Sequence, residues 1–437
     1  MYRLLKARES DPVRVAVIGA GKFSSMFLAQ VRTTPGMRVV GVCDLAPERA
    51  QATLRRSGWS DEEIAEIALY PDAEAVIRQG DPEVVVEATG DPVAGVRHAL
   101  ACIAAGRHVV MVNVEADVLA GPLLARRAAE ADTVYSLAYG DQPALIVELV
   151  DWARICGFEV VCAGKGTKYL PAFHASTPDT VWQHYGISPE RAASGGMNAR
   201  MFNSFLDGTK SAIEMAAVAN ATGLQPATGG LCFPPCGSDD LAETLKPAGD
   251  GGTLPHAGAV EVVSSLQRDG SPVEHDLRRG VFVTFAAPSD YAAACFGEYG
   301  VPTDQSGRYA ALYRPAHLIG LELGISIASA VLRGEPTGAP EGFAADVVAV
   351  AKRDLRAGEV LDGEGGSTVW GRLMPSADSL AADTLPIGLA AGATLKRPIA
   401  AGETVTRAGV ELQVPADVLE IRREMECRAV PENLKYR

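Results

Sequence analysis

Four polar residues recur at helical spacing in the middle of the chain. They are Asn203, Asp207, Lys210 and Glu214. Intervals of 4, 3 and 4 positions predict a single helix with all four side chains on one face. A lysine beside a carboxylate can polarise a ketone oxygen or transfer a proton. The same spacing also fits a surface row of salt bridges, and Gly208 within it indicates close packing.

A cationic segment follows a predicted strand at 158–163. It carries Lys165, Thr167 and Lys168 among glycines, and further hydroxyl groups up to residue 180. In an acidic chain, a local cationic loop favours a clamp for an anionic substrate group. Its spacing is not that of a Walker phosphate loop. A solvated surface loop would have the same composition, so both interpretations stay open.

A strand runs into a glycine-rich turn near the N-terminus. The predicted strand 13–18 is followed by Gly19, Gly21 and a helical pattern. Gly19 permits the tight turn, and Gly21 lets a pyrophosphate approach a helix N-terminus. Ser24 stands where the dinucleotide fingerprint prefers Gly or Ala. Asp44 ends the second predicted strand, where a carboxylate can accept hydrogen bonds from the ribose hydroxyls of NAD.

The charges near this turn leave the choice of nucleotide open. Asp44 favours NAD, because a carboxylate repels the 2′-phosphate of NADP. Lys22 or Arg49 could offset that repulsion, and either fits a solvated surface charge equally well.

Polar residues also follow two later predicted strands. The turn 88–90 comes after the strand 83–87 and would lie near the nicotinamide ribose, and Asn113 and Glu115 follow the next strand. Ordinary turn chemistry is the alternative. The candidate cofactor-binding residues are therefore Gly19, Gly21, Lys22, Phe23, Asp44, Ala88, Thr89, Gly90 and Asn113.

The elements that must position these residues follow from hydrophobic patterning. Near-continuous apolar runs at 13–18, 37–43, 83–87 and 108–112 alternate with helical patterns at 46–56, 62–68 and 93–105. Such runs indicate strands buried on both faces, and their alternation with helices predicts an α/β fold with a doubly wound Rossmann sheet. A length of 437 residues suggests about three domains.

We expect three segments. Residues 1–141 form the dinucleotide-binding Rossmann domain, 142–338 an α+β substrate domain entered by a helix at 144–156, and 339–437 a compact β-rich module. The last rests on an internal repeat, since 353–361 and 397–405 both read Arg-x-apolar-x-Ala-Gly-Glu-x-apolar. Each copy predicts a turn at Ala-Gly between short β segments, and a weaker echo lies at 385–393.

Metal and disulfide frameworks are not indicated. Cys232 and Cys236 enclose two prolines, and with His256 they lack the second ligand pair of a zinc site. The eight cysteines are scattered, so we expect reduced, structural thiols. His174, His184 and His317 belong to no HxxxH pair and favour packed or hydrogen-bonded roles over catalysis.

Charge and hydropathy narrow the class of protein. Forty basic against 54 acidic residues give a net charge of −14, which disfavours nucleic acid and anionic lipid as partners. The N-terminal segment lacks the apolar core of a signal peptide, and the apolar stretch 317–332 contains Glu322 and predicts a buried helix. We expect a cytoplasmic protein that forms homo-oligomers.

The residues resemble a known family. Residues 84–92 and 106–113 are similar to the nucleotide domain of homoserine dehydrogenases, and Asp207 with Lys210 is similar in kind to their substrate-facing pair, at a different spacing. The blocks 139–144 and 164–171, together with the Ala-Gly-Glu repeats, resemble homoserine-dehydrogenase-like proteins with a C-terminal SAF domain. The characterised representatives of that group are 1-deoxy-D-xylulose-5-phosphate reductoisomerase-like enzymes.

The resemblance implies conversion of 1-deoxy-D-xylulose 5-phosphate into 2-C-methyl-D-erythritol 4-phosphate, in non-mevalonate isoprenoid synthesis, with NADPH or alternatively NADH. Lys210 would polarise the ketone, Asp207 or Glu214 would move hydroxyl protons, and a divalent Mg or Mn ion could share the polarisation. Lys165, Lys168 and Arg200 would hold the phosphate. The implied catalytic residues are Lys210, Asp207, Glu214 and Lys168, and the implied substrate-binding residues are Lys165, Thr167, Arg200, Asn203 and Ser204.

Two other functions remain open from the sequence. One is an NAD(P)-dependent dehydrogenase of another small hydroxy acid or sugar derivative, which needs no skeletal rearrangement. The other is a non-catalytic dinucleotide sensor. The row of lysines and carboxylates argues against a sensor, because a sensor has no use for proton transfer.

Overall fold

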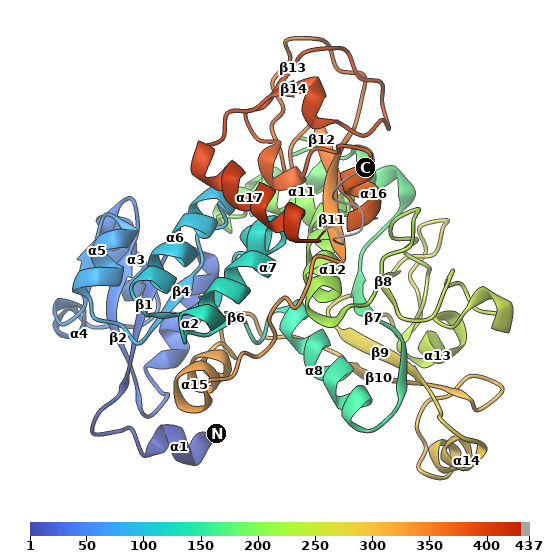
Figure 1. Cartoon of the computed structure of the whole chain (residues 1–437), viewed down its shortest axis with the longest axis horizontal. Helices are drawn as coiled ribbons and strands as arrows, with labels where there is room; N and C mark the ends of the chain where they lie inside the picture. Colours follow the sequence, from blue (N-terminus) through green and yellow to red (C-terminus); the bar gives the residue numbers. More distant parts are fainter. Residues whose placement is uncertain (430–437) are drawn as a thin grey trace. The chain divides into compact units, whose positions relative to one another are not determined.

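A computed structural model describes residues 1–429 of the chain (Figure 1). The chain forms two compact units that each draw on distant segments. The first unit contains Met1–Glu148, His317–Gly342 and Ala416–Arg428, and the second contains Leu149–Ala316 and Phe343–Pro415. The segments 1–141, 142–338 and 339–437 remain our proposal for the modules of the sequence.

The first unit is built on a parallel sheet of six strands in the order β3-β2-β1-β4-β5-β6. This order confirms the predicted doubly wound Rossmann fold. The strands are β1 (Val13–Ile18), β2 (Met37–Cys43), β3 (Ala68–Tyr70), β4 (Val84–Glu87), β5 (His108–Met111) and β6 (Tyr135–Leu137). Their runs of valine and isoleucine are almost fully buried, as strands covered on both faces require.

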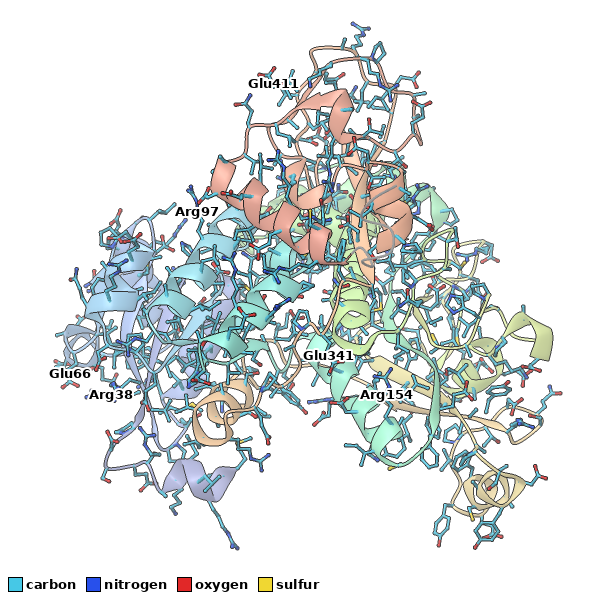
Figure 2. The ribbon with its side chains drawn as sticks, viewed as in Figure 1. Arg38, Glu66, Arg97, Arg154, Glu341 and Glu411 are labelled. Carbon is cyan, nitrogen blue, oxygen red and sulfur yellow. The ribbon has the colours of Figure 1, made fainter. Side chains whose placement is uncertain are left out.

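Helices connect these strands and complete the first unit. They are α1 (Tyr2–Lys6), α2 (Lys22–Val31), α3 (Pro47–Arg56), α4 (Asp61–Ala65), α5 (Ala73–Gln79), α6 (Pro92–Ala104), α7 (Val114–Glu130), the start of α8 (Gln142–Ile155), α15 (Gly324–Arg333) and α17 (Ala416–Ala429). Helix α15 begins seven residues later than the apolar stretch at 317 predicts, and its Leu323, Ile327 and Ala328 belong to the core under the sheet. Arg97 of α6, which Figure 2 labels, pairs with Asp417 of α17, and 2.8 Å separate the nitrogen and oxygen atoms.

The second unit contains a mixed sheet of four strands in the order β10-β9-β7-β8. Only the β7–β8 pair is parallel. The strands are β7 (Glu159–Thr167), β8 (Ala259–Ser264), β9 (Val281–Ala286) and β10 (Tyr309–Arg314). The helices around them are α9 (Val181–Tyr185), α10 (Pro189–Ser194), α11 (Ala199–Leu206), α12 (Thr209–Thr222), α13 (Leu241–Thr244) and α14 (Asp290–Glu298).

Two sequence predictions are wrong in this unit. Lys165 and Thr167 lie in strand β7, not in a flexible loop. A Cβ atom on Gly164 would lie 1.7 Å from the carbonyl oxygen of Glu261, so the glycine reflects a close neighbouring strand. The predicted single helix through 203–214 is also two helices, because Gly208 has a φ of +90° and separates α11 from α12.

The C-terminal part of the second unit contains β11 (Ala345–Ala351), β12 (Val369–Pro375), α16 (Ser376–Ala381), β13 (Thr394–Leu395) and β14 (Val410–Glu411). Strands β11 and β12 are antiparallel and pack against α12. The two copies of the repeat pair with each other, since the amides and carbonyls of Leu355 and Ile399 exchange hydrogen bonds of 2.8 and 3.1 Å.

The predicted turns of the repeat are confirmed. Gly358 and Gly402 occupy the left-handed region with φ of +81° and +83°. In each copy the following glutamate, Glu359 or Glu403, accepts a hydrogen bond from the amide three residues earlier, at 3.0 and 3.1 Å. The shared Ala-Gly-Glu sequence therefore forms the same turn, with the same hydrogen bond, in both copies of the repeat.

All eight cysteines are free thiols, as predicted. No helix within residues 1–429 combines the length and the apolar character needed to span a membrane.

Candidate active site

The glycine-rich turn of the first unit lies between β1 and α2. Gly19 has a φ of +94°, and a Cβ atom there would lie 2.7 Å from the carbonyl oxygen of Ala88. Gly21 is the N-cap of α2, and apart from its two chain neighbours no heavy atom of residues 1–429 lies within 4 Å of the position that its Cβ would take. The chain itself gives no steric reason for glycine at 21. The open space at a helix N-terminus fits a pyrophosphate.

The departure at the third fingerprint position has a local explanation. The hydroxyl of Ser24 is buried and donates a 2.5 Å hydrogen bond to the carbonyl oxygen of Gly19. Serine is small enough for this position, and it ties the first turn of α2 to the glycine turn.

Asp44 lies directly after β2 and is almost fully buried. One carboxylate oxygen accepts from the amide of Ala20 at 3.0 Å, and the other accepts from the amide of Ala46 at 3.0 Å and from Arg49 at 2.6 and 2.9 Å. Burial by itself would raise the pKa of Asp44, but the hydrogen bonds from Arg49 and the two amides hold that pKa below its usual value. The carboxylate is thus ionised and fixed beside the glycine turn.

The polar residues after β4 and β5 hold one another. The hydroxyl of Thr89 donates to Glu87 at 2.6 Å, and the amide nitrogen of Asn113 donates to the carbonyl oxygen of Asp91 at 2.8 Å. Asn113 also caps α7, since its side-chain oxygen accepts from the amide of Ala116 at 3.1 Å. These bonds order both turns at the edge where ligands bind in open α/β sheets.

Sequence reasoning missed Glu87 in this group. It ends β4 with 1% of its surface exposed, and His98 lies 3.1 Å from its Oε1 atom. Within residues 1–429 its Oε2 atom is buried without a hydrogen-bond partner. The signal in the sequence was a carboxylate closing a run of three valines, a costly residue in such a place.

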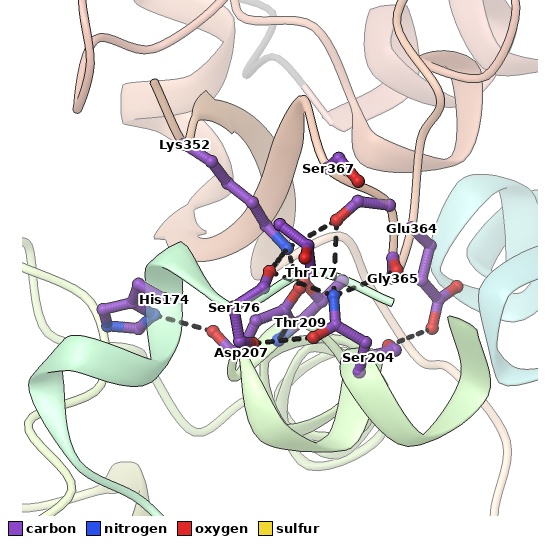
Figure 3. Close-up of polar contacts among 12 residues, drawn as sticks. His174, Ser176, Thr177, Ser204, Asp207, Thr209, Lys352, Glu364, Gly365 and Ser367 are labelled. Carbon is purple, nitrogen blue, oxygen red and sulfur yellow. Dashed lines mark hydrogen bonds and ion pairs between the residues drawn. The ribbon is translucent and has the colours of Figure 1, made fainter. Parts of the chain in front are cut away.

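A buried ion pair lies at the corner between α11 and α12 in the second unit (Figure 3). The Nζ atom of Lys352 is 2.7 Å from Oδ2 of Asp207, and the two side chains are 2% and 0% exposed. Lys352 also donates to the carbonyl oxygens of Ser176 and Gly366, each at 2.7 Å. Burial raises the pKa of Asp207, while the charge of Lys352 and hydrogen bonds from Lys352 and Thr209 oppose that rise.

Asn203 connects the same corner to the C-terminal module. Its amide nitrogen donates to the carbonyl oxygens of Ser176 at 3.1 Å and Gly365 at 3.0 Å, and its side-chain oxygen accepts from the hydroxyl of Ser176 at 2.7 Å. Ser204 donates to Glu364 at 2.5 Å. Both predicted substrate-binding residues therefore hold the loop 362–366 in place.

A histidine and a tyrosine extend the network. Nδ1 of His174 is 2.7 Å from the carbonyl oxygen of Asp207, and Nε2 is 2.9 Å from the hydroxyl of Tyr169. A carbonyl oxygen only accepts, so Nδ1 carries the proton and Nε2 accepts from Tyr169. Burial, with the nearby charge of Lys352, lowers the pKa of His174 and favours this neutral form. The imidazole stacks on Trp370 with ring centres 3.8 Å apart.

Lys165 and Glu214 form a second buried pair. They join β7 to α12 through a short hydrogen bond, and their side chains are 5% and 4% exposed. Lys210 lies in the first turn of the same helix and is half-buried. The structure thus brings Asn203 and Asp207 together at one corner and pairs Glu214 with Lys165.

The other predicted anion ligands have separate surroundings. Lys168 donates to the carbonyl oxygen of His184 at 2.5 Å. Arg200 donates to the carbonyl oxygens of Asp362 and Glu364. Thr167 ends β7 and is half-buried.

Lys352 is the second functional candidate that sequence reasoning missed. It follows the buried strand β11, inside the C-terminal module. A lysine directly after a buried strand that is apolar apart from Asp346 was the available signal, but nothing local pointed to Asp207.

Within the described residues, no three His, Cys, Asp or Glu side chains are grouped in a way that could hold a metal ion.

Three family models match the chain. Residues 13–112 match an oxidoreductase family with an NAD-binding Rossmann fold, residues 140–323 match the catalytic domain of oxidoreductase DRL, and residues 346–411 match the SAF domain. The SAF part of the resemblance is confirmed. None of the three models describes a homoserine dehydrogenase, so that part is without support. A comparison with curated proteins gives no match.

Several solved structures are similar to part of the chain. Myo-inositol dehydrogenase from Lactobacillus casei, solved with NAD(H) and myo-inositol, is 17% identical, covers 39% of this chain and 50% of its own, and has a TM-score of 0.30. The WlbA dehydrogenase from Bordetella pertussis, solved with NADH and UDP-GlcNAcA, is 20% identical, with coverages of 36% and 47% and a TM-score of 0.28. An inositol dehydrogenase homolog from Azotobacter vinelandii, solved with NADH and myo-inositol, is 19% identical, with coverages of 40% and 48% and a TM-score of 0.29.

The chain spans about half the length of each of these structures. Two of the three matched family models describe oxidoreductases, and one of those describes the NAD-binding Rossmann fold found in the first unit. The chain thus joins a segment matched by an NAD-binding oxidoreductase model, a segment matched by the catalytic domain of oxidoreductase DRL, and a C-terminal SAF domain.

Proposed function

We propose that the chain catalyses the NAD(P)H-dependent reduction of a carbonyl group in a small phosphorylated sugar. In its most specific form, the reaction is the conversion of 1-deoxy-D-xylulose 5-phosphate into 2-C-methyl-D-erythritol 4-phosphate, which the resemblance implies. The observation that carries the proposal is Gly21. No neighbour among the described residues requires glycine there, whereas a pyrophosphate at the N-terminus of α2 would.

A bound nicotinamide would supply a hydride to an aldehyde carbon. The turn at Gly19 and Gly21 would hold the pyrophosphate, and Asp44 would accept from the ribose. We propose NADPH, with NADH as the alternative. Arg49 neutralises Asp44 and is itself 60% exposed, so it offers a cation to a 2′-phosphate that Asp44 alone would repel.

In the second unit we propose that Asp207 takes up and returns hydroxyl protons. Lys352 opposes the rise that burial gives to the pKa of Asp207 and fixes the position of the carboxylate, whose ionised form would act as the base. Lys210, in the first turn of α12, would polarise the ketone oxygen. Rearrangement of the carbon skeleton leaves the oxidation state unchanged, and the later reduction consumes one hydride and one proton. Asp207 is the group proposed to handle that proton.

The phosphate is assigned first to Lys168. Lys165 is neutralised by Glu214, and Arg200 donates to two backbone carbonyls. Lys168 donates to a backbone carbonyl and has no carboxylate partner within residues 1–429.

The test is direct. Purified protein is incubated with NADPH and 1-deoxy-D-xylulose 5-phosphate, with and without Mg²⁺ or Mn²⁺, and absorbance at the NADPH band is followed while the product is identified. Formation of methylerythritol phosphate is the expected result. NADPH binding without turnover of this substrate would overturn the specific reaction, and screening of hydroxy acids and other sugar derivatives would then separate a plain dehydrogenase from a sensor.

A further inference from the structure

Two cations share one aromatic ring in the second unit. The Nζ atom of Lys168 lies 5.4 Å from the ring centre of Tyr185, and the guanidinium carbon of Arg278 lies 5.7 Å from the same centre. Tyr185 ends α9 and packs edge-on against Phe202 of α11, with ring centres 5.5 Å apart. The ring is therefore a fixed platform on which both cations are held.

Neither cation has a carboxylate partner in the part of the chain that the structure describes. Buried lysines elsewhere in the chain are paired, as Lys246 is with Asp304 and Lys352 with Asp207. Within residues 1–429, no carboxylate lies at ion-pair distance from Lys168 or Arg278. In a chain with a net charge of −14, two cations that contact one aromatic ring without a carboxylate partner in the described residues stand out from the general pattern.

The positive charges of Lys168 and Arg278 also repel each other. Burial and the charge of Arg278 both lower the pKa of Lys168, so the two cations are close enough to repel. His184, whose carbonyl oxygen fixes Lys168, has a pKa lowered by burial and by Lys168, which favours a neutral ring. A bound anion would relieve the repulsion between the two cations.

We propose that Lys168 and Arg278, held over Tyr185, form a binding site for a phosphate monoester. An ammonium group and a guanidinium group together supply charge and hydrogen-bond donors to a dianion. The inference rests on the proposed function, because it names the end of the substrate that this site receives. Tyr185 packs against Phe202 of α11, the helix that ends directly before Asp207, so the proposed anion site and the proposed base belong to neighbouring parts of the second unit.

Arg278 is the new element of this site. It precedes β9 and lies 110 positions from Lys168, so spacing in the sequence does not connect them. Its neighbour Arg279 has the same charge and is also exposed, but it does not lie over Tyr185. Arg279→Ala is therefore the matched control for Arg278→Ala.

Titration calorimetry of the full chain with inorganic phosphate tests the site without requiring turnover. We expect binding to weaken at least tenfold in Lys168→Ala and in Arg278→Ala, and to be unchanged in Arg279→Ala, with circular dichroism showing that each variant is folded. Arg278→Lys should recover part of the affinity, because it restores the charge without the planar fork. Phosphate bound at the N-terminus of α2 would persist in all variants.

The outcomes separate the two proposals. Equal phosphate binding in the wild type, Lys168→Ala and Arg278→Ala would overturn the anion site, even if 1-deoxy-D-xylulose 5-phosphate is turned over. Phosphate binding that depends on both residues, without turnover of that sugar, would support the site and overturn the specific reaction. The unphosphorylated sugar 1-deoxy-D-xylulose distinguishes a substrate site from a site for free phosphate. A substrate site should bind 1-deoxy-D-xylulose 5-phosphate more tightly than it binds either the unphosphorylated sugar or inorganic phosphate alone. A site for free phosphate should show no such gain over inorganic phosphate.

Discussion

The ammonium nitrogen of Lys352 lies 2.7 Å from a carboxylate oxygen of Asp207, although the residues are 145 positions apart. Lys352 belongs to the segment matched by the SAF domain, and Asp207 belongs to the segment matched by the oxidoreductase catalytic domain. The C-terminal module therefore supplies the counter-charge of a buried carboxylate. This gives the module a part in the proposed active site that its turns and strands alone do not suggest.

Replacing Lys352 by methionine is expected to change the pH dependence of turnover. Lys352 lowers the pKa of Asp207 against the effect of burial, so its loss raises that pKa further. A base with a higher pKa is ionised only at higher pH, so the acidic limb of the kcat profile should move upward and kcat should fall at least tenfold. Lys352→Arg should restore most of the profile.

A structural effect must be separated from this one. Removing one partner of a buried ion pair costs about 3–5 kcal/mol of folding free energy. Lys246→Met breaks another buried pair, Lys246 with Asp304 at 3.0 Å, and should cost similar stability without moving the pH profile. If both variants lose stability and neither moves the profile, Lys352 is a structural residue only.

The bend between α11 and α12 should be sensitive to one methyl group. Gly208 has a φ of +90°, and a Cβ atom there would lie 3.3 Å from His174 and 3.4 Å from Phe233. Gly223 ends α12 with a φ of +72° and no heavy atom within 4 Å of its Cβ position. Both alanine variants should lose about 1–2 kcal/mol from backbone strain.

Only Gly208→Ala should also disturb the site, because it presses on His174. We expect kcat to fall in Gly208→Ala and to stay near the wild-type value in Gly223→Ala, with stabilities measured by urea unfolding. Equal activity in the two variants would show that the bend tolerates displacement of the histidine.

The parts of the fold that sequence predicts are those governed by continuous burial. The strands Val13–Ile18 and Met37–Cys43 have the predicted bounds, since a run of valines between two layers of helices has one favourable conformation. The turns at Gly358 and Gly402 can also be predicted from the sequence, because a turn is specified by its own residues.

The parts that escaped prediction depend on neighbours distant in sequence. Gly166 suggested a loop, yet it lies in strand β7, and a Cβ atom there would lie 2.0 Å from the carbonyl oxygen of Leu277. The glycine therefore allows the backbone near Leu277 to pack closely against the strand. The helical spacing from Asn203 to Glu214 depends only on residue positions. It therefore does not reveal that Gly208, between them, has a positive φ that ends one helix and begins the next. The pairing of Lys352 with Asp207 has no local signature at all.

The two glycines of the dinucleotide turn should respond differently to alanine. Gly19→Ala forces a Cβ into a φ of +94° and within 2.7 Å of a carbonyl oxygen, so it should destabilise the first unit by more than about 1 kcal/mol. Gly21→Ala meets no protein atom within 4 Å and should cost at most about 1 kcal/mol through the weaker N-cap.

The affinity for the cofactor should respond clearly to Gly21→Ala, the variant that changes stability least. Gly21→Ala is expected to weaken NADPH binding at least tenfold while the melting temperature changes little, because the methyl group occupies the space proposed for the pyrophosphate. Fluorescence titration of NADPH measures this. Unchanged affinity in Gly21→Ala would remove the observation on which the proposed function rests.

Asp117 should make the folding stability depend on pH. Its side chain is fully buried in α7, the hydroxyl of Tyr135 donates to it at 2.9 Å, and burial raises its pKa to about 7. The folded pKa lies above the unfolded value of about 3.9. The folded state thus keeps a proton that the unfolded state releases, and stability falls as pH rises from about 4 to 7. The loss is on the order of 4 kcal/mol.

Two variants, one at Asp117 and one at its partner Tyr135, should change this pH dependence in different ways. Asp117→Asn cannot ionise, so its stability relative to the wild type should increase from pH 4 to 7 and then level off. Tyr135→Phe removes a hydrogen bond that lowers the pKa of Asp117, so the decline should extend to higher pH. Urea unfolding at a series of pH values measures both. Parallel curves for wild type and Asp117→Asn would mean that Asp117 is already ionised in the folded protein, and that water or a rearranged side chain satisfies the oxygen that has no hydrogen-bond partner within residues 1–429.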